Sequence, residues 1–343
     1  MVSIFFDEWI IACSTREVTP FVTIIMPALN EEAHIRRAIK SLLPSPEHYP
    51  CELIVVDGGS TDATCLIIEA LARKDPRIRL IHNPRRLQAA GVNHAAKQAN
   101  PISEILIRAD CHAEYPVHFV DLVCRPILEG RAASVVVPMV SRGQTFIQSG
   151  IAIAQNARLG NGGAPHRSAR TSHFVDHGHH AAILKSAYSQ IGGYREDMIA
   201  NEDAEFDLRL KKIGQKIWLC QEAQITYFPR KTFAALARQY FRYGEGRART
   251  CILHRIWPRI RQIAPVLIAS TITMAFIGSG IEPFLVLLPL GYLFLCQAYA
   301  IGLTLRLRQS SALLAGCAAL VMHMSWGFGF LSESFRELIK LRR

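Results

Sequence analysis

Residues 52–64 read ELIVVDGGSTDAT, and this stretch predicts a strand, a turn and the start of a helix. Leu53 to Val56 form a continuous β-rich apolar run, which is typical of a strand buried on both faces of a parallel sheet. Asp57 and two glycines follow where the strand ends, and Asp62 is expected to cap the next helix because its carboxylate can accept from free N–H groups. Ligands of such sheets bind beyond the carboxyl ends of the strands, so Asp57 is placed toward a ligand crevice.

The same alternation of strand and helix recurs along the first two thirds of the chain. Further apolar runs are VTIIM (22–26), RIRLI (77–81), EILIRA (104–109) and ASVVVPM (133–139), with helix-like stretches between them. Asn30 is expected to cap the helix after the first run. The pattern predicts an α/β fold, a doubly wound and mostly parallel sheet covered by helices on both faces.

Three long segments near the C-terminus carry no charged residue, and they predict a membrane domain over 263–343. These segments are 263–280, 283–305 and 310–332. Each can span a hydrocarbon core of about 30 Å at about 1.5 Å rise per residue, and none shows the polar stripe of a helix buried in a soluble domain. Arg306 and Arg308 follow the second segment, which favours a cytoplasmic catalytic part. We expect three spans, with a re-entrant or interfacial third segment as the alternative.

The net charge of +11 is concentrated in front of the first apolar segment. Residues 230–262 carry nine Lys and Arg against one acid, Glu245. Such a basic, aromatic-bearing stretch predicts juxtamembrane helices lying on anionic lipid. Nucleic-acid binding is the alternative that we set aside, because no recognition motif accompanies the charge.

The remaining composition excludes two other classes of site. The nine cysteines include no C-x-x-C pair, so neither a zinc ribbon nor a disulfide framework is implied. The N-terminal extension, 1–20, lacks the basic region of a signal peptide.

Polar residues beyond the strands suggest where chemistry takes place. Asp110 follows the EILIRA run and His112 lies two residues on, which is either a metal site or a polar turn. If the chain stays extended there, both side chains point the same way and Cys111 packs on the other side. A glycine-rich stretch, 160–171, is expected to be a mobile loop, and the four histidines within 173–180 an ordered stretch beside the site.

Five motifs, taken in order, resemble the inverting family 2 glycosyltransferases. They are VTIIMPALNEE (22–32), ELIVVDGGSTDAT (52–64), the region of Asp110, NEDAEF (201–206) and QYFRYGEGR (239–247). The resemblance implies a GT-A catalytic domain over 21–229. It also implies a UDP-sugar donor such as UDP-glucose and transfer with inversion to a lipid-linked glycan in exopolysaccharide synthesis, at the inner membrane.

The resemblance also assigns roles to single residues. The nucleoside pocket is expected from Pro27, Ala28, Asn30, Glu31 and Asp57, the last bonding the base or the ribose. Asp110 and His112 would hold the donor diphosphate through Mn²⁺ or Mg²⁺, and an imidazole ligand favours the former. Arg242 would bind the diphosphate with its fork of donors.

The acidic pair at 202–203 is expected to supply the general base. Asp203 would take the proton of the acceptor hydroxyl, and Glu202 could share that role. The plainer interpretation is that Asn201 caps a helix whose positive end favours two acids. Tyr243 stands where the family commonly has tryptophan, which puts processive synthesis in doubt. A polyprenyl-phosphate sugar synthase and an inactive membrane scaffold with this fold are the alternatives.

Overall fold

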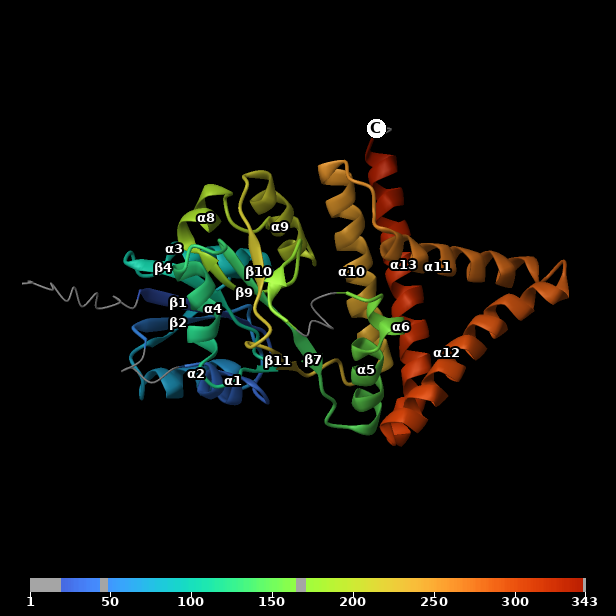
Figure 1. Cartoon of the computed structure of the whole chain (residues 1–343), viewed down its shortest axis with the longest axis horizontal. Coiled ribbons are helices and arrows are strands. Elements are labelled where there is room, and N and C mark those ends of the chain that lie inside the picture. The colour runs from blue at the N-terminus through green and yellow to red at the C-terminus, as the bar shows by residue number, and fades with distance from the viewer. Residues whose placement is uncertain (1–19, 44–48, 165–170, 342–343) are drawn as a thin grey trace, which may run out of the picture.

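A computed structural model describes residues 20–43, 49–164 and 171–341, which form an α/β part and a helical part side by side (Figure 1). The main sheet has the order β3-β2-β1-β4-β9-β6-β10-β8. Its strands are β1 (Phe21–Ala28), β2 (Cys51–Asp57), β3 (Ile78–His82), β4 (Ser103–Arg108), β6 (Ser134–Val137), β8 (His173–Phe174), β9 (His179–Leu184) and β10 (Ile217–Leu219). The first four run parallel, whereas β9 is antiparallel to β4 and β6. The predicted mostly parallel α/β sheet is confirmed.

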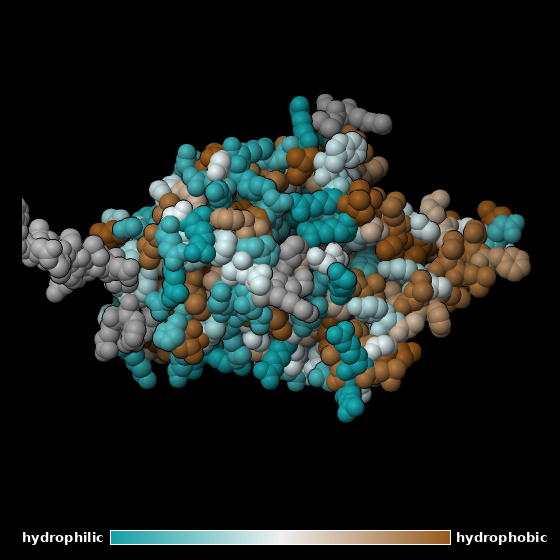
Figure 2. All heavy atoms as spheres, in the orientation of Figure 1, coloured by the Kyte–Doolittle hydropathy of each residue, from teal (hydrophilic) through white to brown (hydrophobic). Residues whose placement is uncertain are grey.

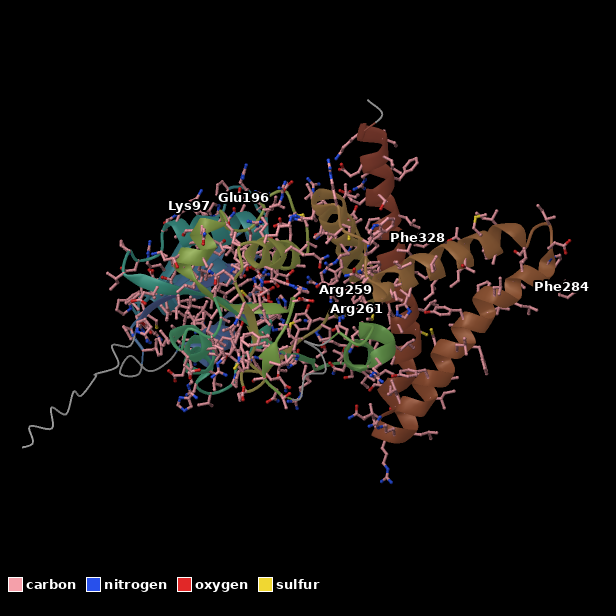
Figure 3. All side chains as sticks on the ribbon, turned by 45° about the horizontal axis from the view of Figure 1, so that its top comes forward. Lys97, Glu196, Arg259, Arg261, Phe284 and Phe328 are labelled. Atoms are coloured by element: carbon pink, nitrogen blue, oxygen red, sulfur yellow. The ribbon has the colours of Figure 1, made fainter. Side chains whose placement is uncertain are left out.

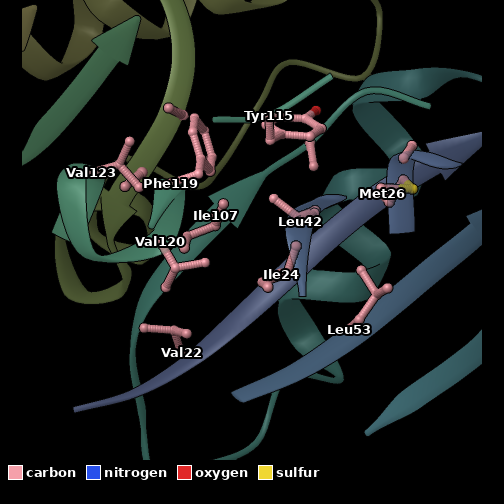
Figure 4. Packing of buried hydrophobic residues seen from close by; sticks show 14 of the residues in the cluster. Val22, Ile24, Met26, Leu42, Leu53, Ile107, Tyr115, Phe119, Val120 and Val123 are labelled. Carbon is pink, nitrogen blue, oxygen red and sulfur yellow. The ribbon is translucent and has the colours of Figure 1, made fainter. Parts of the chain in front are cut away.

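Helices cover both faces of this sheet because successive strand residues point to opposite sides. Ile24 of β1 belongs to the core formed with α1 (Ile35–Leu42), α2 (Thr64–Ala72) and α4 (Phe119–Leu128), shown in Figure 4. Ile25 belongs to the core on the other face, whose helices are α3 (Gln88–Lys97), α8 (Lys185–Gln190) and α9 (Glu202–Lys212). Both residues are almost fully buried.

Two of the predicted helix caps are wrong. Helix α1 begins at Ile35 after His34, and Asn30 lies ahead of it with a positive φ of 55°. The side chain of Asn30 accepts a hydrogen bond from the backbone N–H of Thr61 instead. Asn201 precedes α9 with φ 60°, and its amide donates to the carbonyl of Tyr243, so it joins two helices rather than capping one. Asp62 does accept from the N–H of Thr64, the first residue of α2.

A small second sheet leads from the α/β part to the helical part. It has the order β5-β11-β7, with strands Ala113–Glu114, Ile225–Tyr227 and Met139–Ser141. Helices α5 (Phe146–Asn156) and α6 (Arg158–Asn161) follow β7 and lie beside the C-terminal helices in Figure 1. The catalytic and membrane segments of the sequence are therefore interleaved in space.

The helical part consists of four long helices and two short 3-10 turns within the described residues. They are α10 (Phe233–His254), α11 (Ile260–Gly278), η1 (Pro283–Val286), α12 (Leu287–Leu307), η2 (Ser310–Leu313) and α13 (Leu314–Leu341). Three of the described helical segments, 260–278, 283–307 and 310–340, are long and apolar enough to cross a membrane. In Figure 1 α11 and α12 form a hairpin that projects away from the α/β part, and Figure 2 shows hydrophobic side chains gathered over it.

Helix α13 lies along α10 instead of standing free. A Cβ at Gly244 of α10 would meet the carbonyl oxygen of Trp326 at 2.1 Å, so the two backbones approach closely only because that residue is glycine. Farther along the same pair, Arg336 of α13 bonds Glu245 of α10 at 2.8 Å. In the third segment, 39% of the most apolar 18-residue window is buried inside the protein. The corresponding share is 11% in each of the first two segments. Protein thus covers much of the third apolar segment.

Two expectations fall on residues outside the described ranges. The N-terminal extension lies almost wholly in 1–19, and half of the glycine-rich stretch 160–171 lies in 165–170.

Candidate active site

One cavity of about 1260 Å³ joins the α/β part to the helical part. Loops after β1, β2 and β4, the start of α9 and one face of α10 contribute its walls. Its lining residues include Ala28, Gly58, Asp110, Asp203, Arg242, Arg261, Tyr292 and Trp326. Figure 3 shows Arg261 where the two parts meet and Phe284 far away at the tip of the hairpin. The carboxyl ends of the parallel strands therefore open toward the membrane helices, as the crevice rule expects.

The loops after β1 and β2 support each other at one end of the cavity. Pro27, Ala28 and Glu31, which are expected to form the nucleoside pocket, line this cavity. Asp57, 1% exposed, accepts from the N–H groups of Gly59 and Ser60. Burial opposes ionisation of this carboxyl, but the hydrogen bonds from Ser60 and Gly59 outweigh it and hold its pKa below the usual value. Asp57 thus holds the turn that contains Gly59, and Asn30 holds the same turn from the other loop. Neither side chain lines the cavity, in contrast to the expectation from the sequence.

Asp110 and His112 both line the cavity, but the chain between them is a turn rather than extended strand. Nδ1 of His112 lies 3.4 Å from Oε1 of Glu31, and its ring meets the edge of Tyr227. Asp110 faces a different imidazole, because Nε2 of His179 lies 3.4 Å from Oδ2 of Asp110. Cys111 packs into the core with its thiol directed at the carbonyl of Pro27, as predicted.

The carboxylate of Asp110 and its neighbours have the donor types of a divalent metal site. Among the described residues, no group of three or more His, Cys, Asp or Glu side chains converges closely enough to hold an ion by itself. Burial lowers the pKa of His179 to about 4, so its ring is neutral and keeps a lone pair. One carboxylate and the neutral imidazole of His179 fit a transition ion whose remaining ligands come from a bound diphosphate, whereas Glu31 and Asp110 raise the pKa of His112 against burial.

Glu202, the first residue of α9, is held by a buried arginine. Its Oε1 lies 3.0 Å from Nη2 of Arg108, and both side chains are about nine tenths buried. Burial raises the pKa of Glu202, even though Arg108 opposes that shift. The ion pair with Arg108 thus fixes one oxygen of Glu202, while burial favours the protonated form of its carboxyl.

Asp203 lines the cavity one residue later and differs in its charge environment. Burial alone would raise the pKa of Asp203, but His177, His180 and Arg108 outweigh burial and hold it well below the usual range. One helical turn on, buried Asp207 binds His177 at 2.9 Å and His180 at 2.8 Å. Neighbouring carboxyls whose pKa values are pushed apart are a common sign of divided acid–base roles.

Helix α10 turns a basic face toward the cavity. Arg238, Arg242 and Arg247 recur at near-helical spacing on this face. Gln239 donates to the hydroxyl of Tyr243, which fixes the ring that follows Arg242. Arg261 of α11 extends the same basic wall toward the hairpin.

The sequence did not single out Arg108, His179 and Arg261 as site residues. The histidine-rich tract did signal an ordered stretch beside the site, but β9 alone decides that His179, and not His180, lines the cavity. Arg108 gave no signal beyond its place two residues before Asp110, where strand alternation puts both side chains on one side.

Comparisons with known proteins agree on one family. The family model "Glycosyl transferase family 2" matches residues 23–192. The succinoglycan biosynthesis protein ExoA of Rhizobium meliloti (strain 1021) is 39% identical over 93% of this chain and 96% of its own length. A dolichyl N-acetyl-alpha-D-glucosaminyl phosphate 3-beta-D-2,3-diacetamido-2,3-dideoxy-beta-D-glucuronosyltransferase of Methanococcus voltae is 25% identical over 66% of this chain and 73% of its own length.

Solved structures agree on the fold. The mannosyltransferase PcManGT of Pyrobaculum calidifontis, crystallised with GDP-Man and Mn²⁺, aligns with a TM-score of 0.55 at 18% identity and covers 93% of this chain and 88% of its own. This likeness supports the GT-A fold expected from the motifs. The chain belongs to glycosyl transferase family 2.

Proposed function

We propose that this protein is a membrane-anchored inverting glycosyltransferase that moves glucose from UDP-glucose to a lipid-linked oligosaccharide in succinoglycan-type exopolysaccharide synthesis. The observation that carries the proposal is the single cavity that runs from the strand ends to the membrane helices. A soluble donor can enter beside the α/β part, while an acceptor anchored in lipid can reach the same cavity from the helical side. The similarity to ExoA supports the pathway.

The donor would lie on the strand-end side of the cavity. Its nucleoside fits beside Pro27, Ala28 and Glu31, with Asn30 and Asp57 holding the two loops in shape. Asp110, His112 and His179 do not converge in the described structure, and they would close around a divalent ion when the diphosphate supplies further ligands. Mn²⁺ would bind in preference to Mg²⁺ because of the imidazoles. When bound, that ion would offset negative charge on the departing diphosphate.

Asp203 would act as the general base. The acceptor hydroxyl gives its proton to Asp203 while its oxygen forms a bond to the anomeric carbon, and the bond from that carbon to the diphosphate oxygen breaks on the opposite face. Glu202 stays paired with Arg108 throughout, so a single carboxylate takes the proton. One displacement of this kind inverts the configuration, and the nucleoside diphosphate leaves with the electron pair.

The acceptor would lie on the side of the cavity that α10 and α11 line with arginines. Arg238, Arg247 and Arg261 suit the phosphates of a polyprenyl-linked glycan, since arginine forks match phosphate oxygens. Pro265, Ile268 and Trp326 continue the lining with apolar surface that suits the lipid. The Methanococcus relative bears the name of an enzyme whose acceptor is a dolichyl phosphate-linked sugar, which supports a lipid-linked acceptor here.

The membrane contact would be made by the α11–α12 hairpin, with the catalytic part in the cytoplasm. Since α13 lies along α10 and pairs Arg336 with Glu245, its C-terminal end would stay on the side of the catalytic part. This favours an interfacial third segment over the three spans expected from the sequence. A maleimide-accessibility test at Lys340→Cys, compared with the cysteine-free parent, checks it: labelling only from the opposite side of the membrane contradicts the arrangement.

The function is tested with the purified full-length protein in nanodiscs of anionic lipid. Radiolabelled UDP-glucose, and in parallel a panel of other radiolabelled nucleotide sugars, is supplied with polyprenyl diphosphate oligosaccharides or with polyprenyl phosphate, with and without Mn²⁺. We expect label in the lipid-linked oligosaccharide, in β linkage and dependent on the ion. Label on polyprenyl phosphate alone would instead assign a polyprenyl-phosphate sugar synthase, and no transfer from any nucleotide sugar would leave an inactive scaffold.

A further inference from the structure

Arg108 has an unusual position for an arginine. It ends β4, lies two residues before Asp110 and is 9% exposed. Nη2 pairs with Glu202, and the guanidinium lies over the ring of Tyr194 with its central carbon 5.5 Å from the ring centroid. The guanidinium is thus held in place by Glu202 and by the ring of Tyr194. Both Arg108 and Glu202 line the cavity.

Two of its nitrogen atoms have no hydrogen-bond acceptor among the described residues. Nε and Nη1 of Arg108 are buried, and none of the residues in the described ranges accepts a hydrogen bond from either atom. Guanidinium stays protonated in proteins, so these N–H groups are permanent donors. Buried donors without an acceptor are rare, and their presence beside a cavity points to a ligand oxygen.

The position of the Arg108–Glu202 pair decides which part of the nucleotide-sugar substrate would contact it. The electrostatic neighbours of Arg108 are Glu202, Tyr194, Asp110 and Asp203. The transferred sugar must lie between a diphosphate held near Asp110 and an acceptor oxygen near Asp203. Arg108 lines the same cavity as Asp110 and Asp203, and both carboxylates are among its charged neighbours.

We propose that the Arg108–Glu202 pair is the recognition site for the hexosyl group of the donor. This inference rests on the proposed function and adds the residues that select the sugar. Nε and Nη1 of Arg108 donate to sugar hydroxyls, and Glu202 accepts from a hydroxyl of the same ring. Because the pair is neutral as a whole, it suits an uncharged hexose. A uronate carboxylate would be placed close to Glu202 and repelled.

The test compares binding of UDP and of UDP-glucose, by calorimetry on the full-length protein with Mn²⁺ present. Arg108→Lys keeps the charge but loses the fork, and the double variant Arg108→Met with Glu202→Gln leaves no unpaired buried charge. In both we expect affinity for UDP-glucose to fall about tenfold while affinity for UDP stays within about twofold, since charge-assisted hydrogen bonds to the sugar are lost. Arg209→Lys is the matched control, because Arg209 pairs with Glu205 on the same helix but lies outside the described cavity lining.

A second readout tests the charge argument. Glu202→Gln should raise affinity for UDP-glucuronate relative to UDP-glucose by about tenfold, because the repelling carboxylate is gone. If the ratio of UDP to UDP-glucose affinity is the same in wild type and in both Arg108 variants, the inference is wrong although the proposed function stands. If the wild type binds none of the UDP-sugars, the proposed function fails and this inference with it.

Discussion

The two ends of the cavity differ in both chemistry and origin. The strand-end side carries Asp110, Glu202 and Asp203 among partly buried histidines, all placed by the α/β core. The helical side carries Arg238, Arg247 and Arg261, placed by α10 and α11. A sheet core fixes its side chains rigidly, whereas the basic wall depends on how helices pack beside lipid.

This difference suggests that the strand-end side activates the reacting groups, whereas the helical side binds the acceptor. Buried carboxylates with displaced pKa values suit proton transfer and leaving-group chemistry. Exposed arginine forks suit phosphates, with less demand on exact position. Changes at the strand end should therefore lower kcat, and changes on the basic wall should raise KM for the acceptor.

The largest effect is expected at Asp203. Asp203→Asn should lower kcat by about 10²–10⁴-fold, because the variant cannot take the acceptor proton, while UDP-glucose still binds. Steady-state transfer and calorimetry measure the two quantities. Asp197→Asn is the control: Asp197 pairs with Arg195 and Arg249 on the surface and should leave kcat unchanged. Equal losses in both variants, or full turnover in Asp203→Asn, would remove Asp203 as the base.

The next largest effect concerns the ion. Asp110→Asn should weaken Mn²⁺-dependent binding of UDP by about 100-fold, and His112→Ala and His179→Ala by about tenfold each, because each variant removes one protein ligand. Calorimetric titration of Mn²⁺ in the presence of UDP measures it, with the exposed His173→Ala as control. A variant with the wild-type titration curve would show that its side chain is not a ligand.

On the basic wall the effect should be smaller and of another kind. Arg261→Lys should raise KM for the lipid-linked acceptor about tenfold, because the phosphate loses a bidentate partner, and should leave the affinity for UDP-glucose unchanged. Arg306→Lys, at the end of α12 and outside the described lining, serves as control. If affinity for UDP-glucose also fell about tenfold in Arg261→Lys, the donor and the acceptor would not be bound at separate ends of the cavity.

The smallest effect is a shift in the pH profile. His177 is the first of the groups that hold the pKa of Asp203 below the usual range against burial. His177→Ala should raise that pKa, so the loss of kcat on acidification should begin at a higher pH than in the wild type. Profiles of kcat against pH for His177→Ala and the control His173→Ala test this, and an unchanged acid limb in both would contradict the electrostatic role.

The sheet and most of its helices could be predicted from the sequence because each strand and helix carries its own periodicity. β1 and β2 were found within two residues of their ends. The helix starts were less predictable, since Asn30 and Asn201 adopt left-handed conformations that depend on partners about 30 and 40 residues away, Thr61 and Tyr243. The packing of α13 on α10 was also hidden, because an apolar run does not reveal whether lipid or protein covers it.

At the candidate site, motifs located acidic residues better than their partners. Asp110 and Asp203 both line the cavity, but the extended geometry assumed for Asp110 and His112 is replaced by a turn. His179 and Arg108 reach the site through antiparallel pairing and a buried ion pair, both of which are long-range contacts. A single sequence contains no signal for such contacts.

That donor and lipid-linked acceptor meet in one cavity is tested most directly by photo-crosslinking. A polyprenyl diphosphate oligosaccharide with a diazirine in its first isoprene unit is irradiated with the full-length protein in nanodiscs, and adducts are mapped by mass spectrometry. We expect adducts on the cavity-lining residues of α11 and α13, such as Ile268 and Trp326, and their loss when unlabelled acceptor competes. Adducts confined to the outer surface of the α11–α12 hairpin, and insensitive to competition, would contradict a shared cavity.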